Sequence, residues 1–400
     1  PAPVHGQEEE EDEAEALEAV NPRPPAVPPE SVPPGTDSVT AIPGETYGAG
    51  GLHRFLFGDL NRDLWNIPIT VEVLDLGAVG GGLTPDELSG GMQTVGLHFD
   101  GADGLPYQFR SIVKDATRAI PSPLRISPLT DVAQDQMAAQ FPLGAMVVAE
   151  LLQAADVLVA PPRPVVMPDD PRLGKYRELF AGRMGWIEER PDEREGDRPG
   201  FHGSAKVTGT EELYERLDED PRNFVDAENY LTARLIDMLV GDWDRHQDQW
   251  RWASFAEGDR TRWRPVPRDR DWAFSRIDGL FPGWAGSYYP QYQGFGRTYP
   301  SVFNLHWNAQ FLDRRLLSPL PRQAYEDAAL RLQRVLSDDV LRAAVGVLPA
   351  SYRDAVGEEL FEALRARRDE LPRVAREYYE LLARWVDVHA ANSDDLVTVI

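Results

Sequence analysis

The residues best suited to do chemistry lie in the segment Gly241–Gln249, which reads GDWDRHQDQ. Asp244 stands in this segment, Gln249 follows five residues later, and Asp269 and Asp271 come after a predicted β-hairpin. Metal-assisted phosphoryl transfer needs one Asp to orient the acceptor hydroxyl, an amide to hold a metal, and a second acidic site for metal that bridges the phosphates. We therefore predict that Asp244 orients an acceptor and that Gln249, Asp269 and Asp271 hold metal.

The elements around these residues are predicted to hold them in two neighbouring loops. Apolar residues recur at helical spacing in Asn223–Val240, and Gly241 is placed to end that helix. Gln249–Phe255 and Arg262–Val266 are typical of two strands joined by a turn at Gly258. The acidic segments would thus lie at the two open ends of one hairpin.

The string DRHxxQ followed by DxD resembles the atypical branch of the protein-kinase-like fold. That branch includes phosphoinositide kinases, HipA-type kinases, secretory-pathway kinases and the spore-coat CotH kinases. CotH-type sequences are the most similar, because this chain has WDRH and a D-x-D-x-x-F string at Asp269–Phe274. The resemblance implies a catalytic segment Asp244-Arg245-His246, a metal-binding Asp269 or Asp271, and ATP with Mg²⁺ or Mn²⁺. Gln249 departs from the Asn usual in these kinases, and its longer arm shifts the metal ligand.

The region before this site is predicted to be rich in strands. Ile69–Leu76, Met92–Phe99 and Tyr107–Lys114 alternate apolar and polar residues and are separated by glycine-containing turns. This pattern indicates a three-stranded antiparallel meander. Asp131–Val157 follows as a long helical pattern that we expect to be interrupted at Pro142.

A kinase cleft also needs a glycine-rich turn over the phosphates and a lysine on the third strand. Lys114 fits the lysine position, because the alternation places it on one face with Arg110 and Ile112. We expect Asp135 to be its acidic partner, with Glu150 as the second possibility. An ordinary hairpin that ends in a solvent-exposed lysine stays open as the other interpretation. The glycines predicted to contact phosphate are Gly80, Gly81, Gly82, Gly90 and Gly91.

The fold class predicted is α+β: a two-lobed, protein-kinase-like domain with a small antiparallel β-rich N-lobe and a mainly helical C-lobe. Residues 1–46 contain an acidic and a proline-rich run and are expected to be a disordered tail. The N-lobe is assigned to residues 47–190 and the C-lobe to residues 191–392. Residues 393–400 are expected to begin a further domain, so the chain would be part of a multidomain protein. An aromatic-rich stretch between Asp271 and Arg314 is expected mainly to pack on the C-lobe.

Composition limits the partners. The formal net charge of −25 repels phosphate backbones, so we expect no nucleic-acid partner. The chain has no cysteine, which excludes thiol nucleophiles and cysteine zinc sites. No uninterrupted apolar run reaches about 18 residues, so we expect no membrane insertion by this segment. The compartment stays open between the cytoplasm and the periplasm or export.

Three functional hypotheses follow. The first is an atypical kinase that transfers the γ-phosphoryl group of a nucleotide to a hydroxyl acceptor. The second is a catalytically weak pseudokinase that acts as a nucleotide-binding or scaffold module, which Gln249 would favour. The third is a metallohydrolase using His246 with nearby aspartates, but the seven histidines are scattered without an HxH or HxxxH pair.

Overall fold

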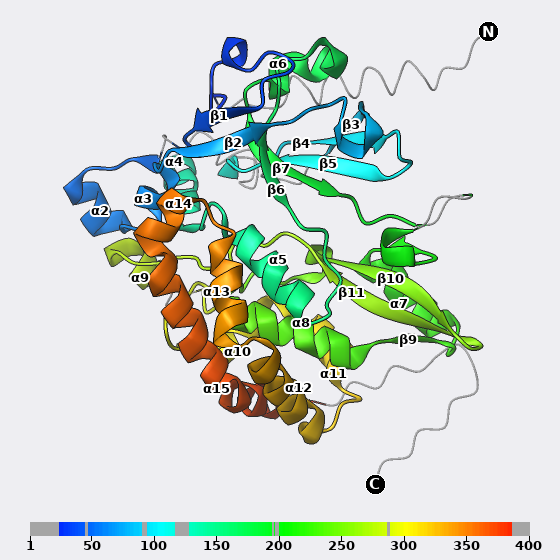
Figure 1. The fold of residues 1–400 in the computed structure, drawn as a ribbon. Helices are drawn as coiled ribbons and strands as arrows, with labels where there is room; N and C mark the ends of the chain where they lie inside the picture. Colours follow the sequence, from blue (N-terminus) through cyan, green and yellow to red (C-terminus); the bar gives the residue numbers. More distant parts are fainter. Residues whose placement is uncertain are drawn as a thin grey trace. The chain divides into compact units, whose positions relative to one another are not determined.

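The structure, a computed structural model, describes residues 24–44, 47–89, 94–116, 128–193, 196, 200–285 and 289–385. By its contacts the chain divides into two compact units, shown in Figure 1. The first unit comprises Pro1–Gly48, Trp65–Ala138 and Pro162–Arg190. The second comprises Ala49–Leu64, Ala139–Pro161 and Pro191–Ile400.

The first unit is built on a seven-stranded sheet with the order β1-β2-β6-β7-β5-β4-β3. Neighbouring strands are antiparallel except β2 and β6. Apolar side chains from the sheet and from α6 (Arg177–Phe180) form its core, including Leu97, Phe109, Val165 and Phe180. The strands are β1 (Ser38–Ala41), β2 (Ile69–Val73), β3 (Leu83–Ser89), β4 (Gly96–Gly101), β5 (Pro106–Ser111), β6 (Arg163–Val166) and β7 (Met184–Glu189).

The predicted meander exists, but with a different first strand. β4 and β5 correspond to two of the predicted strands, and β5 ends at Ser111, three residues before Lys114. The strand that precedes β4 in the meander is β3, which the sequence suggested was part of a glycine-rich loop. β2 instead pairs with β1 and β6. Its alternating burial suits either neighbour, because periodicity reports which face is buried and not which strand lies beside it.

The proline-rich segment belongs to the first unit and is not a free tail over its described part. Ser38–Ala41 forms β1, and Val27 and Val32 are buried. The backbone N–H of Val27 donates to the carbonyl of Gly182. Proline is tolerated in the first turn of a helix and at sheet edges, so this segment forms the 3-10 turn Pro29–Ser31 and the strand β1. The acidic run and residues 393–400 lie outside the described residues.

The predicted interruption at Pro142 is confirmed. α4 (Pro128–Gln136) continues into a 3-10 turn, Met137–Ala139, and α5 (Gly144–Ala154) starts after the proline. α4 groups with the first unit, whereas α5 groups with the second, although the sequence assigned both to the N-lobe. The reason is packing: the buried apolar face of α5 contacts α8 (Ala227–Val240) and α13 (Asp338–Gly346).

The second unit combines a four-stranded sheet with helices, so the chain is α+β, with mainly antiparallel sheets and a helical C-terminal region. The sheet order is β8-β10-β11-β9, and β10 and β11 form the predicted hairpin, with Trp250 paired to Pro267. Its strands are β8 (Val207–Thr208), β9 (Asn223–Val225), β10 (Trp250–Glu257) and β11 (Arg260–Pro267). Its other helices are α2 (Gly51–Phe57), α3 (Arg62–Trp65), α7 (Thr210–Glu219), α9 (Leu280–Ala285), α10 (Val302–His306), α11 (Gln310–Leu317), α12 (Arg322–Val335), α14 (Ala350–Tyr352) and α15 (Glu358–Leu382).

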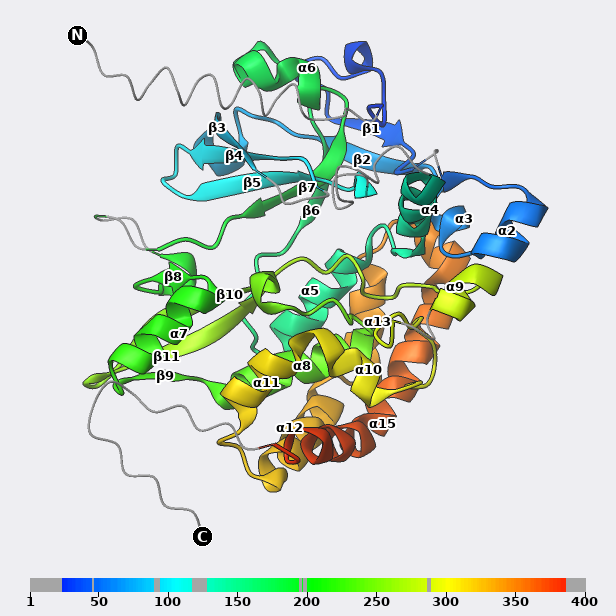
Figure 2. The same cartoon turned by 180° about the vertical axis from the view of Figure 1, so that it is seen from behind.

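α8 is the central helix of the second unit. It begins after Asp226, whose side chain accepts a hydrogen bond from the backbone N–H of Asn229, and it ends at Gly241. Every residue from 230 to 240 is buried. Helices α5, α11, α12 and α15 contact it, and both Figure 1 and Figure 2 show α5 and α11 next to it.

In the described part of the chain no single helix is both long and apolar enough to cross a membrane. One bent pair, Asp131–Ala139 with Gly144–Ala154, meets the length and composition limits jointly.

Candidate active site

The loop that carries Asp244 starts from a rigidly held helix end. Gly241 adopts the left-handed conformation with φ of 71°, as the sequence predicted for a helix-ending glycine. A Cβ atom at this position would come within 3.2 Å of the ring of Phe295. The loop therefore leaves α8 in a direction that only glycine accommodates without strain.

Arg367 of α15 fixes the same helix end from the other side. Its Nε donates to the carbonyl of Leu239 at 2.8 Å and its Nη2 to that of Met238 at 2.7 Å. Its guanidinium also lies over the rings of Phe295 and Tyr299. The last carbonyls of a helix have no partners within it, so this buried arginine supplies the donors that they lack. No sequence pattern indicated this role, because Arg367 lies 126 positions beyond Gly241.

The residues of the loop divide into buried and partly exposed ones. Asp242 and Arg245 are buried, whereas Asp244, His246 and Gln249 are partly exposed. The three partly exposed side chains are the predicted chemical groups, and they lie close together. Nε2 of His246 is 4.0 Å from Oδ1 of Asp244 and 3.2 Å from Nε2 of Gln249.

The contact between Gln249 and His246 determines which atom of the Gln249 amide faces away from the histidine. An amide nitrogen only donates, so Nε2 of His246 accepts and the imidazole carries its proton on Nδ1. The amide oxygen of Gln249 takes no part in that contact. This oxygen is the atom that would bind a metal ion.

Asn308 is a neighbour of Asp244 that the sequence analysis missed. Its Nδ2 donates to Oδ1 of Asp244 at 3.2 Å. Asn308 lies between α10 and α11 in a 3-10 turn, Trp307–Ala309. An amide donor on one carboxylate oxygen helps to fix the orientation of the Asp244 side chain.

Arg245 joins the two predicted loops. Its Nη1 donates to the carbonyls of Arg268 at 2.7 Å and Asp269 at 2.9 Å, and its Nη2 donates to the carbonyl of Gln249 at 3.1 Å. The guanidinium also lies 4.8 Å from the ring centroid of Trp250. These contacts hold both open ends of the β10–β11 hairpin together, so Arg245 has a positioning role.

Asp237 is the buried acid around which three arginines gather. Nη1 of Arg234 donates to Oδ2 at 2.6 Å, Nε of Arg245 lies 3.4 Å from the same oxygen, and Arg270 donates to Oδ1. Burial by itself would raise the pKa of Asp237, but the guanidiniums of Arg270, Arg245 and Arg234 hold it below the ordinary value. Asp237 thereby connects α8 to both loops.

The network continues away from the site to Asp313 of α11. Nε of Arg234 donates to Oδ1 of Asp313 at 2.9 Å, and the hydroxyl of Tyr230 donates to the same oxygen at 2.7 Å. Arg234, Asp237 and Asp313 are all fully buried. Such a chain of ion pairs specifies one arrangement of loops and helices, since removing one member leaves buried charges uncompensated. A charged residue within the apolar run Leu235–Val240 is the sequence signal that would have identified Asp237.

Asp242 is the second buried acid of the loop. Its Oδ2 lies 3.5 Å from Nη1 of Arg270 and 3.7 Å from Nη1 of Arg245. Burial raises the pKa of Asp242 to about 6, although both guanidiniums act in the opposite direction. This carboxyl therefore changes its charge close to neutral pH.

The second acidic segment is shaped by its middle residue. Arg270 is buried against Asp237, whereas Asp269 and Asp271 on either side of it are partly exposed. Asp269 has a φ of 51°, which is unusual for a residue with a side chain. Further along, the N–H of Phe274 donates to the carbonyl of Val240, which attaches the segment to the end of α8.

Aromatic side chains support the two segments, as expected for packing. Trp243 lies 4.6 Å from Trp272 and 5.9 Å from Tyr292, measured between ring centroids. Phe274 packs edge-on against Phe141 and Phe295. The stretch after Asp271 therefore packs on the loop of Asp244 through apolar contacts.

The oxygen donors suit a hard divalent cation. Asp244, Asp269, Asp271 and the amide oxygen of Gln249 are carboxylate and carbonyl groups, the ligands that Mg²⁺ and Mn²⁺ prefer. The described residues contain no group of three or more His, Asp or Glu side chains placed to hold a metal ion. A site of this kind would use few protein ligands together with nucleotide phosphates, as Mg²⁺ sites in phosphotransferases do.

In the first unit, Lys114 is buried and lies beside α4. The side chain of Gln134 donates to the carbonyl of Lys114 at 2.9 Å and accepts from the N–H of Ala116 at 2.9 Å. Asp135 is the next residue of the same helix and is partly exposed. Gln134, which the sequence analysis did not single out, thus holds the backbone at Lys114, and the pairing of Lys114 with Asp135 stays a prediction.

The glycine triplet lies away from Lys114. The carbonyls of Gly80 and Gly82 accept hydrogen bonds from the turn after β4, at Asp103 and Ala102. Lys114 instead follows the end of β5, where Ser111 bonds to Val95 before β4. The two positions are separated by the length of β4, about 17 Å at 3.4 Å per residue. The assignment of Gly80, Gly81 and Gly82 to phosphate stays a prediction, and Gly90 and Gly91 lie outside the described residues.

No protein-family model matches the chain, and no curated protein matches its sequence. The structure has similarity, at low identity, to kinase-like folds. A Helicobacter pylori proinflammatory kinase, CtkA, matches with a TM-score of 0.38 and 11% identity, over 74% of this chain and 95% of that one. HipA from a Shewanella oneidensis MR-1 toxin–antitoxin complex with HipB and operator DNA matches with a TM-score of 0.34 and 13% identity, over 60% of this chain and 57% of that one. Because both TM-scores lie below 0.5, we take the chemistry of the site from its own residues.

Proposed function

We propose that the chain is a metal-dependent phosphotransferase that moves the γ-phosphoryl group of a nucleotide such as ATP to a hydroxyl acceptor. The observation that carries the proposal is the clamp by Arg245, which holds the loop of Asp244 and Gln249 against the segment of Asp269 and Asp271. The finer likeness to CotH-type kinases belongs to this proposal as well.

In the proposed reaction, Asp244 accepts a hydrogen bond from the acceptor hydroxyl and orients its oxygen toward the γ-phosphorus. The oxygen–phosphorus bond to the acceptor forms, the bond to the nucleoside diphosphate breaks, and the acceptor proton passes to Asp244. Asn308 fixes the rotamer of Asp244. Gln249, Asp269 and Asp271 would hold Mg²⁺ or Mn²⁺, which neutralises charge on the phosphates when bound. His246 orients Gln249 through the contact described above.

Lys114 keeps its predicted role in binding nucleotide phosphate, with Asp135 as its acidic partner. The role of Lys114 is tested by its own variant, Lys114→Ala.

The second candidate is a pseudokinase that binds nucleotide without transferring phosphate. Gln249 favours it, because the longer amide arm places the metal-binding oxygen about one bond length further along than Asn would. Both candidates require nucleotide binding, so the transfer step distinguishes them.

The test combines a thermal-shift titration with a transfer assay using γ-labelled ATP and Mg²⁺ or Mn²⁺. Bound ligand stabilises by RT ln(1 + [L]/Kd), roughly 2.7 kcal/mol at a hundredfold excess over Kd. We expect a metal-dependent shift in the wild type that Asp244→Asn retains and that Asp269→Asn/Asp271→Asn and Lys114→Ala lose. Transfer of label to protein or to water should be lost in Asp244→Asn. Asp259→Asn, an exposed acid in the hairpin turn, is the matched control.

A shift without any transfer would select the pseudokinase. A folded protein that shows no shift with any nucleotide and either metal would rule out both candidates.

A further inference from the structure

Arg183 of the first unit is a buried arginine that the proposed phosphotransfer does not use. It stands immediately before β7 and is only 6% exposed. Its Nε donates to the carbonyl of Leu179 one turn earlier. Within the described residues no Asp or Glu forms an ion pair with it, and its Nη1 and Nη2 make no hydrogen bond there.

A buried guanidinium that no acid in the described part of the chain neutralises is unusual on energetic grounds. Taking a charge out of water is costly unless an opposite charge and hydrogen-bond acceptors compensate for it. Burial also lowers the pKa of Arg183, which is the direction expected when no anion stabilises the charged form. By comparison, Arg177 nearby is exposed and pairs with Asp169 at 2.6 Å.

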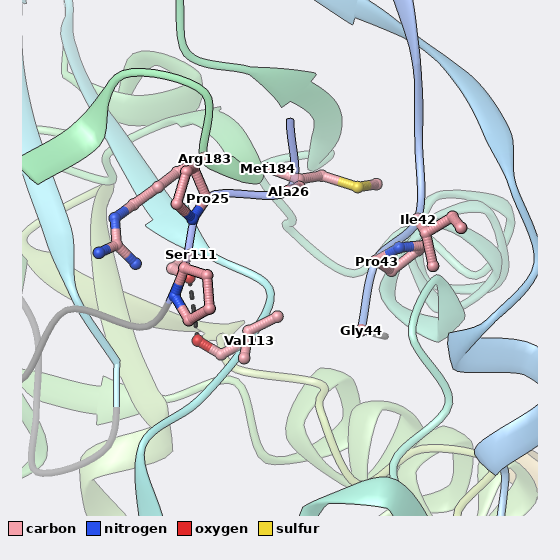
Figure 3. A pocket seen from close by; sticks show the side chains of 10 residues that line it. Pro25, Ala26, Ile42, Pro43, Gly44, Ser111, Val113, Arg183 and Met184 are labelled. Carbon is pink, nitrogen blue, oxygen red and sulfur yellow. Dashed lines mark hydrogen bonds between the residues drawn. The ribbon is translucent and has the colours of Figure 1, made fainter. Parts of the chain in front are cut away.

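Arg183 lines a small cavity of about 80 Å³. Figure 3 shows Arg183 and Pro25 on one side of it and Ile42 and Pro43 across from them. Among the described residues that line the cavity most atoms are carbon, and Arg183 carries the single charged side chain. The remaining lining residues are Pro24, Ala26, Gly44, Ser111, Val113 and Met184.

We propose that this cavity binds a small, singly charged carboxylate with a short hydrocarbon body. Nη1 and Nη2 form a planar fork that matches the two oxygens of a carboxylate. The proline, isoleucine and methionine side chains provide apolar contact for a few carbon atoms.

The charge count selects a carboxylate over a phosphate. A phosphate carries close to two negative charges at neutral pH, and the described residues of the cavity lining offer one positive charge. About one of the two negative charges of a phosphate would then be removed from water without an opposite charge beside it, which is unfavourable. A carboxylate is balanced by Arg183 alone.

The test is a thermal unfolding titration of the full chain with propionate, at constant ionic strength set by chloride. We expect the unfolding midpoint of the wild type to rise with propionate and to level off. Arg183→Met, which keeps the stem and removes the charge, should unfold at a higher temperature than the wild type without propionate and should not respond to it. Arg183→Lys keeps the charge but loses the fork, so its apparent affinity for propionate should fall by about tenfold.

Arg177→Met is the matched control, since it removes an exposed, paired arginine of the same unit and should leave the response unchanged. Equal responses of the wild type and Arg183→Met would overturn the proposal, as would a wild type that does not respond. Inorganic phosphate acting as strongly as propionate would overturn the choice of a singly charged ligand. None of these readouts depends on nucleotide, so they are independent of the phosphotransfer proposal.

Discussion

Arg245 and Asp269 lie 24 residues apart in the sequence and are joined by a hydrogen bond of 2.9 Å from Nη1 of the arginine to the carbonyl oxygen of the aspartate. The hairpin β10–β11 occupies the residues between them. The bond closes this hairpin at its base, so the backbones of the two loops that carry Asp244 and Asp269 are tied together. Arg245 itself is held by the buried acid Asp237.

Replacing Asp237 with Asn should destabilise the protein and displace both loops. Three guanidiniums would lose their shared carboxylate, and breaking a buried ion pair in this way costs about 3–5 kcal/mol. Urea unfolding measures the loss, and the transfer assay should show a fall in rate beyond the loss of folded protein. Asp220→Asn, which removes an exposed ion pair with Arg222, should have little effect on either. Equal stabilities of the two variants would contradict the network.

The pH dependence of stability should carry a signature of Asp242. Its pKa in the folded protein is about 6, above the ordinary 3.8, so the folded state binds this proton more tightly than the unfolded chain does. This proton's contribution to the free energy of unfolding is fully present below about pH 4 and is lost as the pH rises through about 6. At 1.36 kcal/mol per pKa unit, the contribution that is lost is about 3 kcal/mol.

Asp242→Asn should therefore remove this slope. Urea unfolding of the wild type and the variant at about pH 5 and about pH 8 gives the comparison, and only the wild type should lose this contribution at the higher pH. Asp237 contributes in the opposite sense, since its pKa is lowered, and its contribution is lost only as the pH falls through that lowered pKa. Parallel slopes for the two proteins would show that Asp242 does not titrate in this range.

Gly241→Ala should lower both stability and transfer. The backbone there has positive φ, and the added Cβ would meet the ring of Phe295 at 3.2 Å. We expect a loss of about 1 kcal/mol or more in the free energy of unfolding, measured in urea. Gly258→Ala in the hairpin turn is the matched control, because Gly258 also has positive φ but nothing lies within 4 Å of the added atom. Gly258→Ala should reduce stability by strain alone and leave transfer unchanged.

Gln249→Leu should weaken metal binding, because the variant keeps the bulk of the side chain and removes the amide oxygen. We expect the metal concentration for a half-maximal nucleotide-induced thermal shift to rise by about tenfold or more. Gln249→Asn retains an amide oxygen and should be affected less. Gln247→Leu, an exposed glutamine in the same loop, should match the wild type. A metal requirement that is identical in Gln249→Leu and Gln247→Leu would exclude Gln249 as a ligand.

The local sequence determined the elements that carry the site. The helical spacing of apolar residues before Gly241 predicted a helix that ends there. The turn at Gly258 predicted a hairpin, and Pro142 predicted a helix break. The structure contains all three. These features depend on backbone preferences of a few adjacent residues, which is why they can be derived from the sequence alone.

Only the tertiary structure decided which segments meet. Periodicity did not reveal that β3 replaces β2 in the meander, that β1 joins the sheet, or that Gly80 lies a strand's length from Lys114. Nor did it show that Asp237 gathers three arginines or that Arg367 closes the end of α8. Strand pairing and buried ion pairs join residues far apart in the chain, and their energies depend on what surrounds each group after folding. A local pattern carries no record of those surroundings.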